Sequence, residues 1–502
     1  MRITNGMMIN NSLRDINNNK LNVDRLTTQL STEKVIQKPS DDPIVAIRAL
    51  RFRSNLSELN QYLKRNIEDA QSWLKVTEDA LVSARKMIQN MEPDLVRGAT
   101  ESLGTQEREA IIKDLEAFRE QIFQDANADY GNRTIFTGYK TDSDMTFKTA
   151  ESTTKYSITQ EVGIGSIDKK SVVDNKVAAT ATGPIAGADL PSMHTVYRLR
   201  LAYDKLDIEV ANDINTVIDI KDKDGNTVIS ADAVYADGGA YKDAAGNEVD
   251  PYSPPAGKSY INIDTGEIIF SDAAYATYAA RTENGASLKL TYQKTGFEKN
   301  DLRPEQYFSC VKTTAASTTD IAYSGAAQDI EYTVNFNQKL KVNTEGREVY
   351  SHDIIRDIDE LLENVLYVGQ IETNMSNIKN KMKTAEGTEL DELKSVYEAL
   401  EKEYTLAEDI MQKRFEEAIT EFQNHQKKFD LAITDVGNRN VRLNLNKERL
   451  TSQQTNLEEL QSKNEDANLA ETAILLKTAK DVYEGSLSAA SNILSNNLLD
   501  FI

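Results

Sequence analysis

Seven apolar residues recur at every seventh position near the C-terminal end of this chain. They are Phe415, Phe422, Phe429, Val436, Leu443, Leu450 and Leu457. A seven-residue repeat keeps one apolar stripe on a helix that winds slightly around a partner. Proline would interrupt such a helix, and the sequence has none after Pro304. The repeat therefore predicts a very long helix that packs along other helices in a coiled-coil-like seam.

A second apolar stripe lies in the N-terminal part of the chain. From Ala49 to Trp73 apolar residues follow one another in alternating steps of three and four, with Asn66 as one member, and this is the period of a helix with one buried face. The segment from Ile111 to Ile122 repeats the pattern. We expect these helices to pack on the long helix as a bundle within one chain. The N-terminal contribution to the predicted seam is Phe52, Leu56, Leu59, Leu63 and Trp73.

Each end of the chain carries one further amphipathic stripe with no third helix nearby in sequence. Two helices alone bury too little apolar surface to offset the entropy of ordering them. We therefore expect the two terminal helices to pair with each other and with other copies of the chain. A charge placed there, as in Leu487→Asp, would be buried without a partner at a cost of about 3–5 kcal/mol. The predicted assembly interface is Ile9, Leu13, Ile16, Val23, Leu30, Leu469, Leu476, Tyr483, Leu487, Leu494, Leu498 and Phe501.

The turn between the first two stripes consists of Pro39, Ser40, Asp41, Asp42 and Pro43. Pro39 disfavours helical backbone at the residue before it. Asp42 can cap the next helix, and Pro43 suits its first position. The sequence predicts that this turn joins an inner layer of terminal helices to the next layer outward.

Between about residues 138 and 348 the chain becomes rich in Gly, Thr, Tyr, Val and Asp. The segments 216–230, 259–270 and 287–294 combine strand-forming residues with Asp-Gly, Thr-Gly and Asn-Gly turns. Similar fragments at 221–228 and 242–249 indicate two similar hairpins. The first begins like a calcium loop but lacks the glutamate that closes an EF-hand, so we interpret it as a turn.

These patterns predict a mainly α protein with an inserted β-rich domain and a coiled-coil or helical-bundle stalk formed by long terminal helices. The predicted division is an inner layer of residues 1–38 and 463–502, a helical bundle of 39–137 and 349–462, and an outward-facing β-rich domain of 138–348.

The composition disfavours several classes of function. The formal net charge of the 502 residues is −22, whereas a nucleic-acid surface needs clustered Lys and Arg. The three histidines are far apart, Cys310 is the single cysteine, and neither a Walker loop nor a GxSxG sequence occurs. We expect no enzyme activity, metal site or cofactor. The start lacks the apolar core of a signal peptide and no long apolar run follows, so we expect no cleaved signal and no membrane insertion.

Four segments resemble the flagellin superfamily. They are MRITNGMM at the start, LSTEKVIQKPSDDPIVAIRALRFRSNL, ANADYGNRTIFTGYKT, and the C-terminal run from NEDANLAETAILL to LLDFI. The SDDP sequence and the LLDFI ending are most similar to the hook–filament junction family (hook-associated protein 3), since flagellins tend to carry a KDDAAG-like phrase instead. The resemblance covers about residues 1–150 and 350–502, and extends weakly to 301–308 and 341–354.

The resemblance implies a non-catalytic axial protein of the bacterial flagellum. Its implied partners are other copies of itself in a ring or helical lattice, the first hook-associated protein, flagellin, the flagellar export apparatus, and an export chaperone on the C-terminal helix. The implied location is extracellular, at the hook–filament junction, after export without a cleaved signal peptide. Two alternatives stay open: a divergent flagellin that forms the filament itself, and a secreted coiled-coil effector with an active or binding middle domain.

Overall fold

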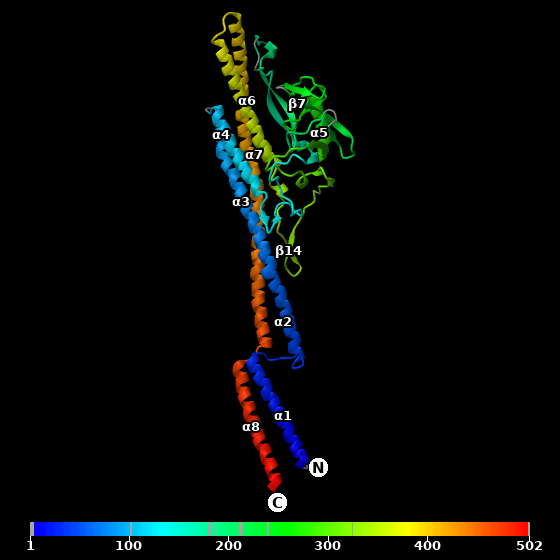
Figure 1. Cartoon of the computed structure of the whole chain (residues 1–502), viewed down its shortest axis with the longest axis vertical. Coiled ribbons are helices and arrows are strands. Elements are labelled where there is room, and N and C mark those ends of the chain that lie inside the picture. The colour runs from blue at the N-terminus through cyan, green and yellow to red at the C-terminus, as the bar shows by residue number, and fades with distance from the viewer. Residues whose placement is uncertain are drawn as a thin grey trace. The chain divides into compact units, whose positions relative to one another are not determined.

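The computed structural model describes residues 5–100, 103–178, 181, 183–185, 187–209, 214–237, 240–323 and 325–499. Long helices occupy both ends of the sequence and strands occupy its middle (Figure 1). The predicted fold class, mainly α with an inserted β-rich domain, is confirmed. The helices are α1 (Asn5–Thr32), α2 (Pro43–Gln61), α3 (Ile67–Gly98), α4 (Thr105–Asp125), α5 (Asp272–Thr282), α6 (His352–Met382), α7 (Thr388–Glu465) and α8 (Leu469–Leu499).

The chain divides into two compact units. Unit 1 comprises residues 1–71, 332–340 and 441–502, and unit 2 comprises residues 72–331 and 341–440. The three-part division expected from the sequence stays a prediction. Within the described ranges, no helix has both the length and the apolar character that a membrane span requires.

The predicted long C-terminal helix is present as α7, which runs for 78 residues without a proline. Six of the seven heptad residues, from Phe415 to Leu450, are buried, and Leu457 is half-buried. Among the N-terminal seam residues Phe52 is half-buried. The others, Leu56, Leu59, Leu63 and Trp73, are buried.

One wide turn interrupts the second helical stripe. Residues Tyr62–Asn66 form a π-helical turn, η1, between α2 and α3. The extra residue in this turn moves Ile67 into the buried position that the pattern had assigned to Asn66. The side-chain amide of Asn66 instead donates to the Thr333 carbonyl at 2.7 Å. The sequence pattern was wrong here because regular spacing assumes an unbroken α-helix.

Among the described residues, eleven strands form one sheet in the order β13-β12-β3-β11-β6-β7-β9-β10-β5-β4, with β8 paired to β7. The β7–β9 pair is parallel and the other pairs are antiparallel. The strands are β3 (Lys155–Val162), β4 (Ile167–Asp174), β5 (Ser192–Arg200), β6 (Val217–Lys221), β7 (Thr227–Asp237), β8 (Ala240–Asp243), β9 (Ser259–Asn262), β10 (Glu267–Phe270), β11 (Leu288–Lys294), β12 (Ser309–Thr313) and β13 (Thr318–Ile321).

Two short hairpins lie outside this sheet. They are β1 (Asp129–Tyr130) with β2 (Arg133–Thr134), and β14 (Glu331–Asn335) with β15 (Gln338–Lys341).

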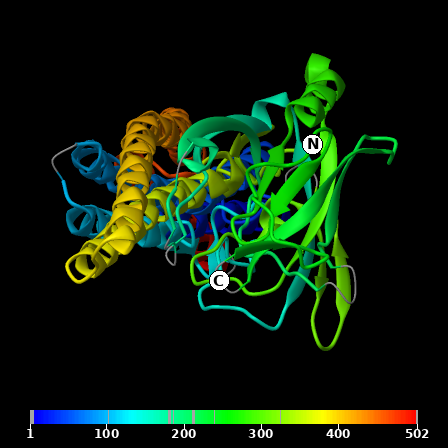
Figure 2. The same ribbon diagram turned by 90° about the horizontal axis from the view of Figure 1, so that it is seen from above.

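The sheet has its own apolar core on the face that α5 covers. Leu199, Ile220, Ile268 and Tyr278 belong to this cluster of 24 buried side chains. Figure 2 shows the twisted sheet with α5 beside it. The sequence analysis missed α5, because its alanines and tyrosines gave no recognised stripe within a segment of strand-like composition. Ser271 caps the helix by accepting a hydrogen bond from the Ala274 amide.

The two similar fragments form the same tight turn, as predicted. Gly225 and Gly246 have φ values of +86° and +88°, which glycine adopts without a steric cost. The Asp222 carboxylate accepts from the Asn226 amide at 2.9 Å, and Asp243 accepts from the Asn247 amide at 2.8 Å. These carboxylates therefore act as turn caps.

The segment before β3 pairs with the segment after β11. The Glu151 amide donates to the Phe297 carbonyl at 2.9 Å, and the Phe297 amide donates back at 2.7 Å. The Phe147 amide donates to the Asp301 carbonyl at 2.9 Å. The two ends of the part of the sheet from β3 to β11 are therefore held together by backbone pairing, and β12 and β13 follow later in the chain.

Candidate assembly interface

The two terminal helices, α1 and α8, pack side by side within unit 1 (Figure 1). Leu26, Leu476 and Ala479 form the centre of their contact, and Val23 and Leu30 pack against it. Leu26 is 5% exposed and Leu476 is 8% exposed. The pair therefore buries part of the stripe that the sequence assigned to assembly. The predicted residues Ile9, Ile16 and Tyr483 are half-buried.

Three predicted interface residues remain exposed on this helix pair. Leu13, Leu469 and Leu487 are 56%, 44% and 43% exposed. Leu487 is thus not buried within the single chain, and a charge there would be desolvated only in an assembly. The side chains of Leu494 and Leu498, and all of Phe501, lie outside the described residues.

A short backbone bridge connects the start of α8 to the end of α1. The Val35 amide donates to the Glu465 carbonyl at 2.8 Å, and the Ala467 amide donates to the Glu33 carbonyl at 2.8 Å. Glu33 has a φ of +60°, a conformation that non-glycine residues adopt at an energetic cost. At this bridge α1 ends and α8 begins. The two helices run in opposite chain directions.

Side chains reinforce this bridge. The Glu465 carboxylate, 3% exposed, accepts from Arg53 Nε at 3.1 Å and from a terminal guanidinium nitrogen at 2.5 Å. These hydrogen bonds lower the pKa of Glu465. Lys34 pairs with Asp466, and its hydrogen bond lowers the pKa of that carboxyl. The Asn464 side chain also donates to the Val45 carbonyl at 3.1 Å, so α2 and the end of α7 are tied to the same joint.

The predicted turn lies beside this joint. Asp42 caps α2 by accepting from the Ile44 amide at 2.9 Å and the Val45 amide at 3.2 Å, and Pro43 begins the helix, as predicted. Asp41 accepts from the Gln37 and Lys38 amides at 3.0 and 2.9 Å. These amides lower the pKa of Asp41. Pro39 and Ser40 are exposed in the turn.

Unit 1 carries most of the exposed apolar side chains of the described chain. Of 25 large apolar residues that lie exposed, 17 belong to this unit. They include Ile44, Ile47 and Leu50 on α2 and Phe336 at the tip of the β14–β15 hairpin, where 72% of its side chain is exposed. The concentration of exposed large apolar side chains on one unit favours this unit as the part of the chain that another molecule covers.

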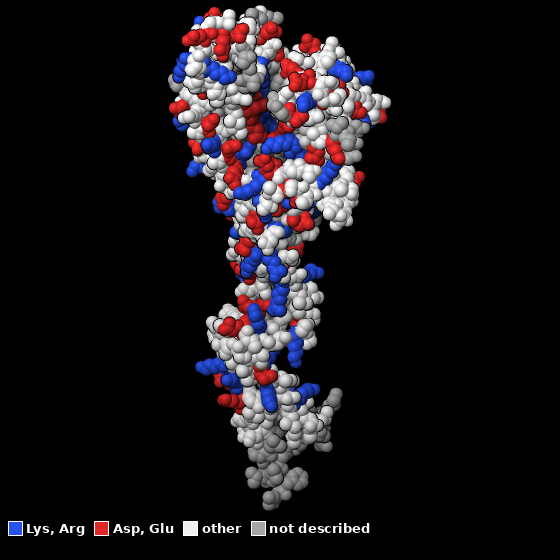
Figure 3. Space-filling view, turned by 45° about the horizontal axis from the view of Figure 1, so that its top comes forward, with Lys and Arg blue, Asp and Glu red and all other residues white. Residues whose placement is uncertain are grey.

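The charge of the chain is unevenly divided between the units. Unit 1 contains 18 Lys and Arg against 17 Asp and Glu, whereas unit 2 contains 40 against 63. Figure 3 shows wide uncharged areas on unit 1 and closely spaced charged residues on unit 2. Copies of unit 1 can therefore approach one another without net repulsion, whereas copies of unit 2 repel one another.

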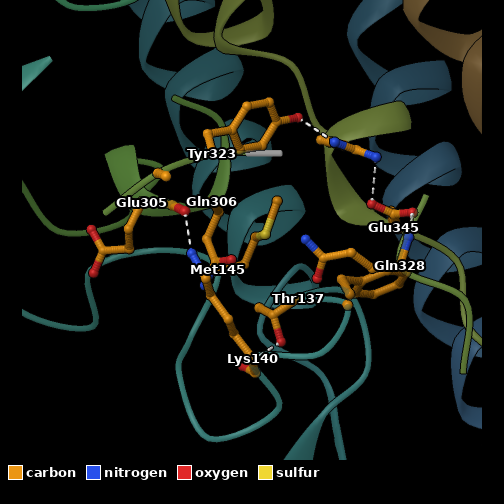
Figure 4. A pocket seen from close by; sticks show the side chains of 12 residues that line it. Thr137, Lys140, Met145, Glu305, Gln306, Tyr323, Gln328 and Glu345 are labelled. Atoms are coloured by element: carbon orange, nitrogen blue, oxygen red, sulfur yellow. Dashed lines mark hydrogen bonds and ion pairs between the residues drawn. The ribbon is translucent and has the colours of Figure 1, made fainter. Parts of the chain in front are cut away.

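A small pocket in unit 2 is lined by polar and charged side chains (Figure 4). Its volume is about 90 Å³. The Lys140 ammonium donates to the Glu305 carbonyl at 2.7 Å, and Arg347 pairs with Glu345 at 2.8 Å. Its charged side chains are thus engaged in structural contacts. Over the described part of the chain, no group of three or more His, Cys, Asp and Glu side chains could hold a metal ion.

The ionic contacts of the joint were not predicted from the sequence. Arg53 and its partner Glu465 are 412 positions apart in the chain. A signal existed in the Asn-Glu-Asp sequence at 464–466, which follows the heptad repeat directly. Nothing in the linear pattern, however, paired this acidic end with α2.

The N-terminal part of the chain matches a known family model. Residues 3–141 match the family model described as the bacterial flagellin N-terminal helical region. The chain carries a flagellin-type N-terminal region. The resemblance to the flagellin superfamily is therefore confirmed for residues 3–141, which include α1 to α4 and the β1–β2 hairpin. The resemblance of residues 350–502 stays a prediction.

Curated relatives are flagellar proteins. The flagellar hook-associated protein 3 of Salmonella typhimurium and that of Escherichia coli are each 31% identical over 144 residues, which is 28% of this chain and 45% of each relative. A flagellin of Clostridium tyrobutyricum is 26% identical over 141 residues, 28% of this chain and 37% of that protein. The matched segment thus spans less than half the length of these relatives.

Solved structures with low similarity include two flagellar proteins. A putative flagellar hook-associated protein from Vibrio parahaemolyticus is 12% identical to this chain, with a TM-score of 0.36. The alignment covers 85% of this chain and 100% of the Vibrio chain. The flagellar junction protein FlgL of Legionella pneumophila has 9% identity, covers 84% and 100% of the two chains, and has a TM-score of 0.27.

Proposed function

We propose that this chain is a structural, axial component of the bacterial flagellum that joins the hook to the flagellin filament. The observation that carries the proposal is the character of unit 1, which is almost neutral and displays most of the exposed large apolar side chains. Such a unit gains apolar burial when copies pack side by side. The similarity of the N-terminal region to hook-associated protein 3 supports the hook–filament junction as the place of assembly.

The partners follow from the same proposal. Other copies of the chain cover α1 and α8, with Leu13, Leu469 and Leu487 as exposed contact residues and Ile9, Ile16 and Tyr483 as half-buried ones. The first hook-associated protein and flagellin bind the two ends of the assembled ring. An export chaperone shields the apolar residues of α8 before assembly, and the chain reaches the cell exterior through the flagellar export apparatus without a cleaved signal peptide.

A divergent flagellin is the second candidate, because the same N-terminal region also matches a flagellin. The two functions differ in self-assembly. Purified monomer of a flagellin should elongate into filaments from short seeds of its own assembly, whereas a junction protein should add only a limited layer. Electron microscopy of seeded and unseeded monomer distinguishes them. Long filaments of this chain alone would contradict the junction proposal.

The junction proposal also predicts a position in the flagellum. Gold-labelled antibody against unit 2 should mark one band between hook and filament in cells that express the chain. A deletion strain should secrete flagellin monomer and lack filaments, and the full-length chain should restore them. Label along the whole filament would instead support the flagellin alternative.

A further inference from the structure

The inserted sheet has two chemically different faces. In β5, Leu199 points into the apolar core, whereas Arg198 and Arg200 on either side of it point to the opposite face because successive side chains of a strand alternate. The same alternation in β10 places Ile268 in the core and Glu267 on the other face. The face away from the core thus carries charged side chains, and it lies against α6 and α7.

The charged residues of this face pair with two acidic residues one turn apart on α6. Arg198 donates to Glu360 at 2.7 Å and to Glu267 at 2.7 Å, and Arg200 donates to Asp357 at 2.7 Å. We call this group the charge cluster. Its members are Lys170, Arg198, Arg200, Glu267, Asp357, Glu360 and Arg414.

The charge cluster is buried and connects three elements. Arg198 is 3% exposed, Glu267 is 2% exposed and Asp357 is 1% exposed. Arg414 of α7 lies 3.3 Å from both Asp357 and Glu360. The sheet, α6 and α7 therefore meet through ion pairs from which most water is excluded.

An aromatic contact accompanies these ion pairs, because the His352 ring of α6 lies 4.8 Å from that of Tyr203. On the charged face, one cluster of four apolar residues is found among the described side chains: Val172, Val196, Tyr252 and Ile269. Three of them, Val172, Val196 and Ile269, lie two residues from Lys170, Arg198 and Glu267 in β4, β5 and β10 and so share their face. The core on the opposite face contains 24 buried side chains, Tyr203 among them. Detaching the sheet from the helices would therefore separate Tyr203 from His352 but leave the rest of this core packed.

Two cavities border the charge cluster. One, of about 540 Å³, is lined by Lys170, Arg198, Glu360 and Arg414 among others. The other, of about 190 Å³, is lined by Arg200, Glu267 and Glu360 among others. Solvent that enters these cavities would hydrate each charge as it is freed, which lowers the cost of separating the ions.

We propose that the charge cluster is a releasable latch, from which the inserted sheet detaches as a folded domain while its two chain connections still hold it. The ion pairs set the docked position, since Arg198 and Arg200 must meet Glu360 and Asp357 in one register. Further hydrogen-bonded contacts separate in the same step. The Val177 amide leaves Glu403, from 2.8 Å, and the Ile185 amide leaves Ser395, from 3.0 Å. The Arg356 guanidinium of α6 leaves the Thr265 carbonyl. The detached domain keeps the core that includes α5.

The test uses the full-length chain with Glu360→Gln. This substitution removes the charge that Arg198, Arg200 and Arg414 share. Glu417→Gln is the matched control, because Glu417 also pairs with Arg414 but is half exposed. Cysteine-directed spin labels at the exposed positions Thr227 and Lys402 report the distance between the sheet and α7, and the native Cys310 is buried from the label.

Glu360→Gln should increase the detached fraction by roughly 100-fold or more and add a second, longer spin-label distance. Hydrogen exchange of the β6 and β11 amides should remain as slow as in the wild-type chain, and Glu417→Gln should leave both readouts unchanged. An unchanged distance in Glu360→Gln would overturn the proposal. Loss of β6 and β11 protection together with the longer distance would also overturn it, because the sheet would then be unfolding instead of detaching.

Discussion

At the scale of single residues, burial decides what the ionisable groups do. His352 is buried in unit 2 among Tyr203, Tyr307 and Phe308, with ring centroids 4.8, 4.6 and 5.4 Å away. Its Nε2 has no hydrogen-bond partner in the described structure. Burial lowers the pKa of His352 to about 3, while Asp353 opposes and Arg356 adds to that shift. The imidazole is therefore an uncharged aromatic member of the core.

This burial predicts acid sensitivity from one residue. In the unfolded chain His352 is protonated below about pH 6.5, whereas in the folded chain it is protonated only below about pH 3. The free energy of unfolding therefore falls as the pH drops from 6.5 towards 3. Between pH 7.5 and 5 the wild type should lose roughly 2 kcal/mol of unfolding free energy from this group. His352→Phe should remove that loss in urea titrations at the two pH values. His194→Gln, at a partly exposed position, is the control, and an unchanged pH slope in His352→Phe would contradict the argument.

The joint of unit 1 depends on another single residue. Replacing Glu465 by alanine removes both hydrogen bonds from Arg53, and charged hydrogen bonds of this kind contribute about 1–3 kcal/mol. The Val35 and Ala467 amides should then exchange at least roughly tenfold faster, as measured by hydrogen-exchange mass spectrometry. Glu459→Gln, in an exposed pair with Lys463, serves as control. Equal exchange rates in Glu465→Ala and the wild type would show that the backbone bridge holds without the ion pair.

At the scale of elements, the boundaries of the helices follow from local chemistry. Asp42 ends the turn after α1 and starts α2, because its carboxylate accepts the first free amides of the helix. The π-helical turn at Tyr62–Asn66 is different, since no proline or glycine marks it. Its position is set by packing, which favours Ile67 over Asn66 at the buried site.

The cap gives a prediction for α2 alone. Asp42→Ala should destabilise the first turn of α2 by about 1 kcal/mol, whereas Asp42→Asn should retain most of the cap. Exchange of the Ile44 and Val45 amides measures the effect. If the Ile44 and Val45 amides exchange at the same rate in both variants, the side-chain oxygen of residue 42 does not stabilise this turn.

At the scale of the whole molecule, charge and apolar surface are divided between the two units. The almost neutral unit 1 carries the exposed apolar residues, and unit 2 carries the excess of acidic residues. Net repulsion between acidic units limits how closely they pack. The proposed assembly therefore depends on unit 1.

Leu487→Asp tests this division. Because Leu487 is 43% exposed in the single chain, the variant should change the melting temperature of the monomer by no more than a few degrees. In the assembly the new carboxylate would be buried without a partner, so junctions should not form in cells that secrete the variant. Ser488→Asp, at the adjacent exposed position, is the control. Normal filament attachment with Leu487→Asp would contradict a role for this surface.

The insertion can be tested by removal. Glu151 and Phe297 are paired through their backbones, so a two-residue Asn-Gly turn can replace residues 152–296. This change removes β3 to β11 and α5 and leaves β12 and β13. The shortened chain should still assemble, because unit 1 is unchanged. Electron microscopy of hook–filament junctions measures this. Secretion of a folded but non-assembling chain would show that the inserted sheet takes part in assembly.

Much of the fold could be predicted from the sequence, because helices and hairpins depend on residues close together in the chain. The heptad from Phe415 to Leu450, the cap at Asp42 and the two Asp-Gly-type turns follow from local spacing and local hydrogen bonds. The flagellin-type N-terminal region was recognisable from its motifs. The helix α5 was missed because its composition resembles that of the surrounding strands.

The sequence by itself determined the long helices, the strand-rich character of the insertion and the flagellin-type motifs of the N-terminal region. Only the tertiary structure decided which charged residues meet. Arg53 and Glu465 are 412 positions apart in the chain, and Arg198 and Glu360 are 162 positions apart. In a linear pattern, one acidic residue resembles another. The structure also decided that Leu476 is covered by α1 while Leu487 remains exposed. Burial is a property of the packed chain, and a periodic pattern gives the face of a helix without its partner.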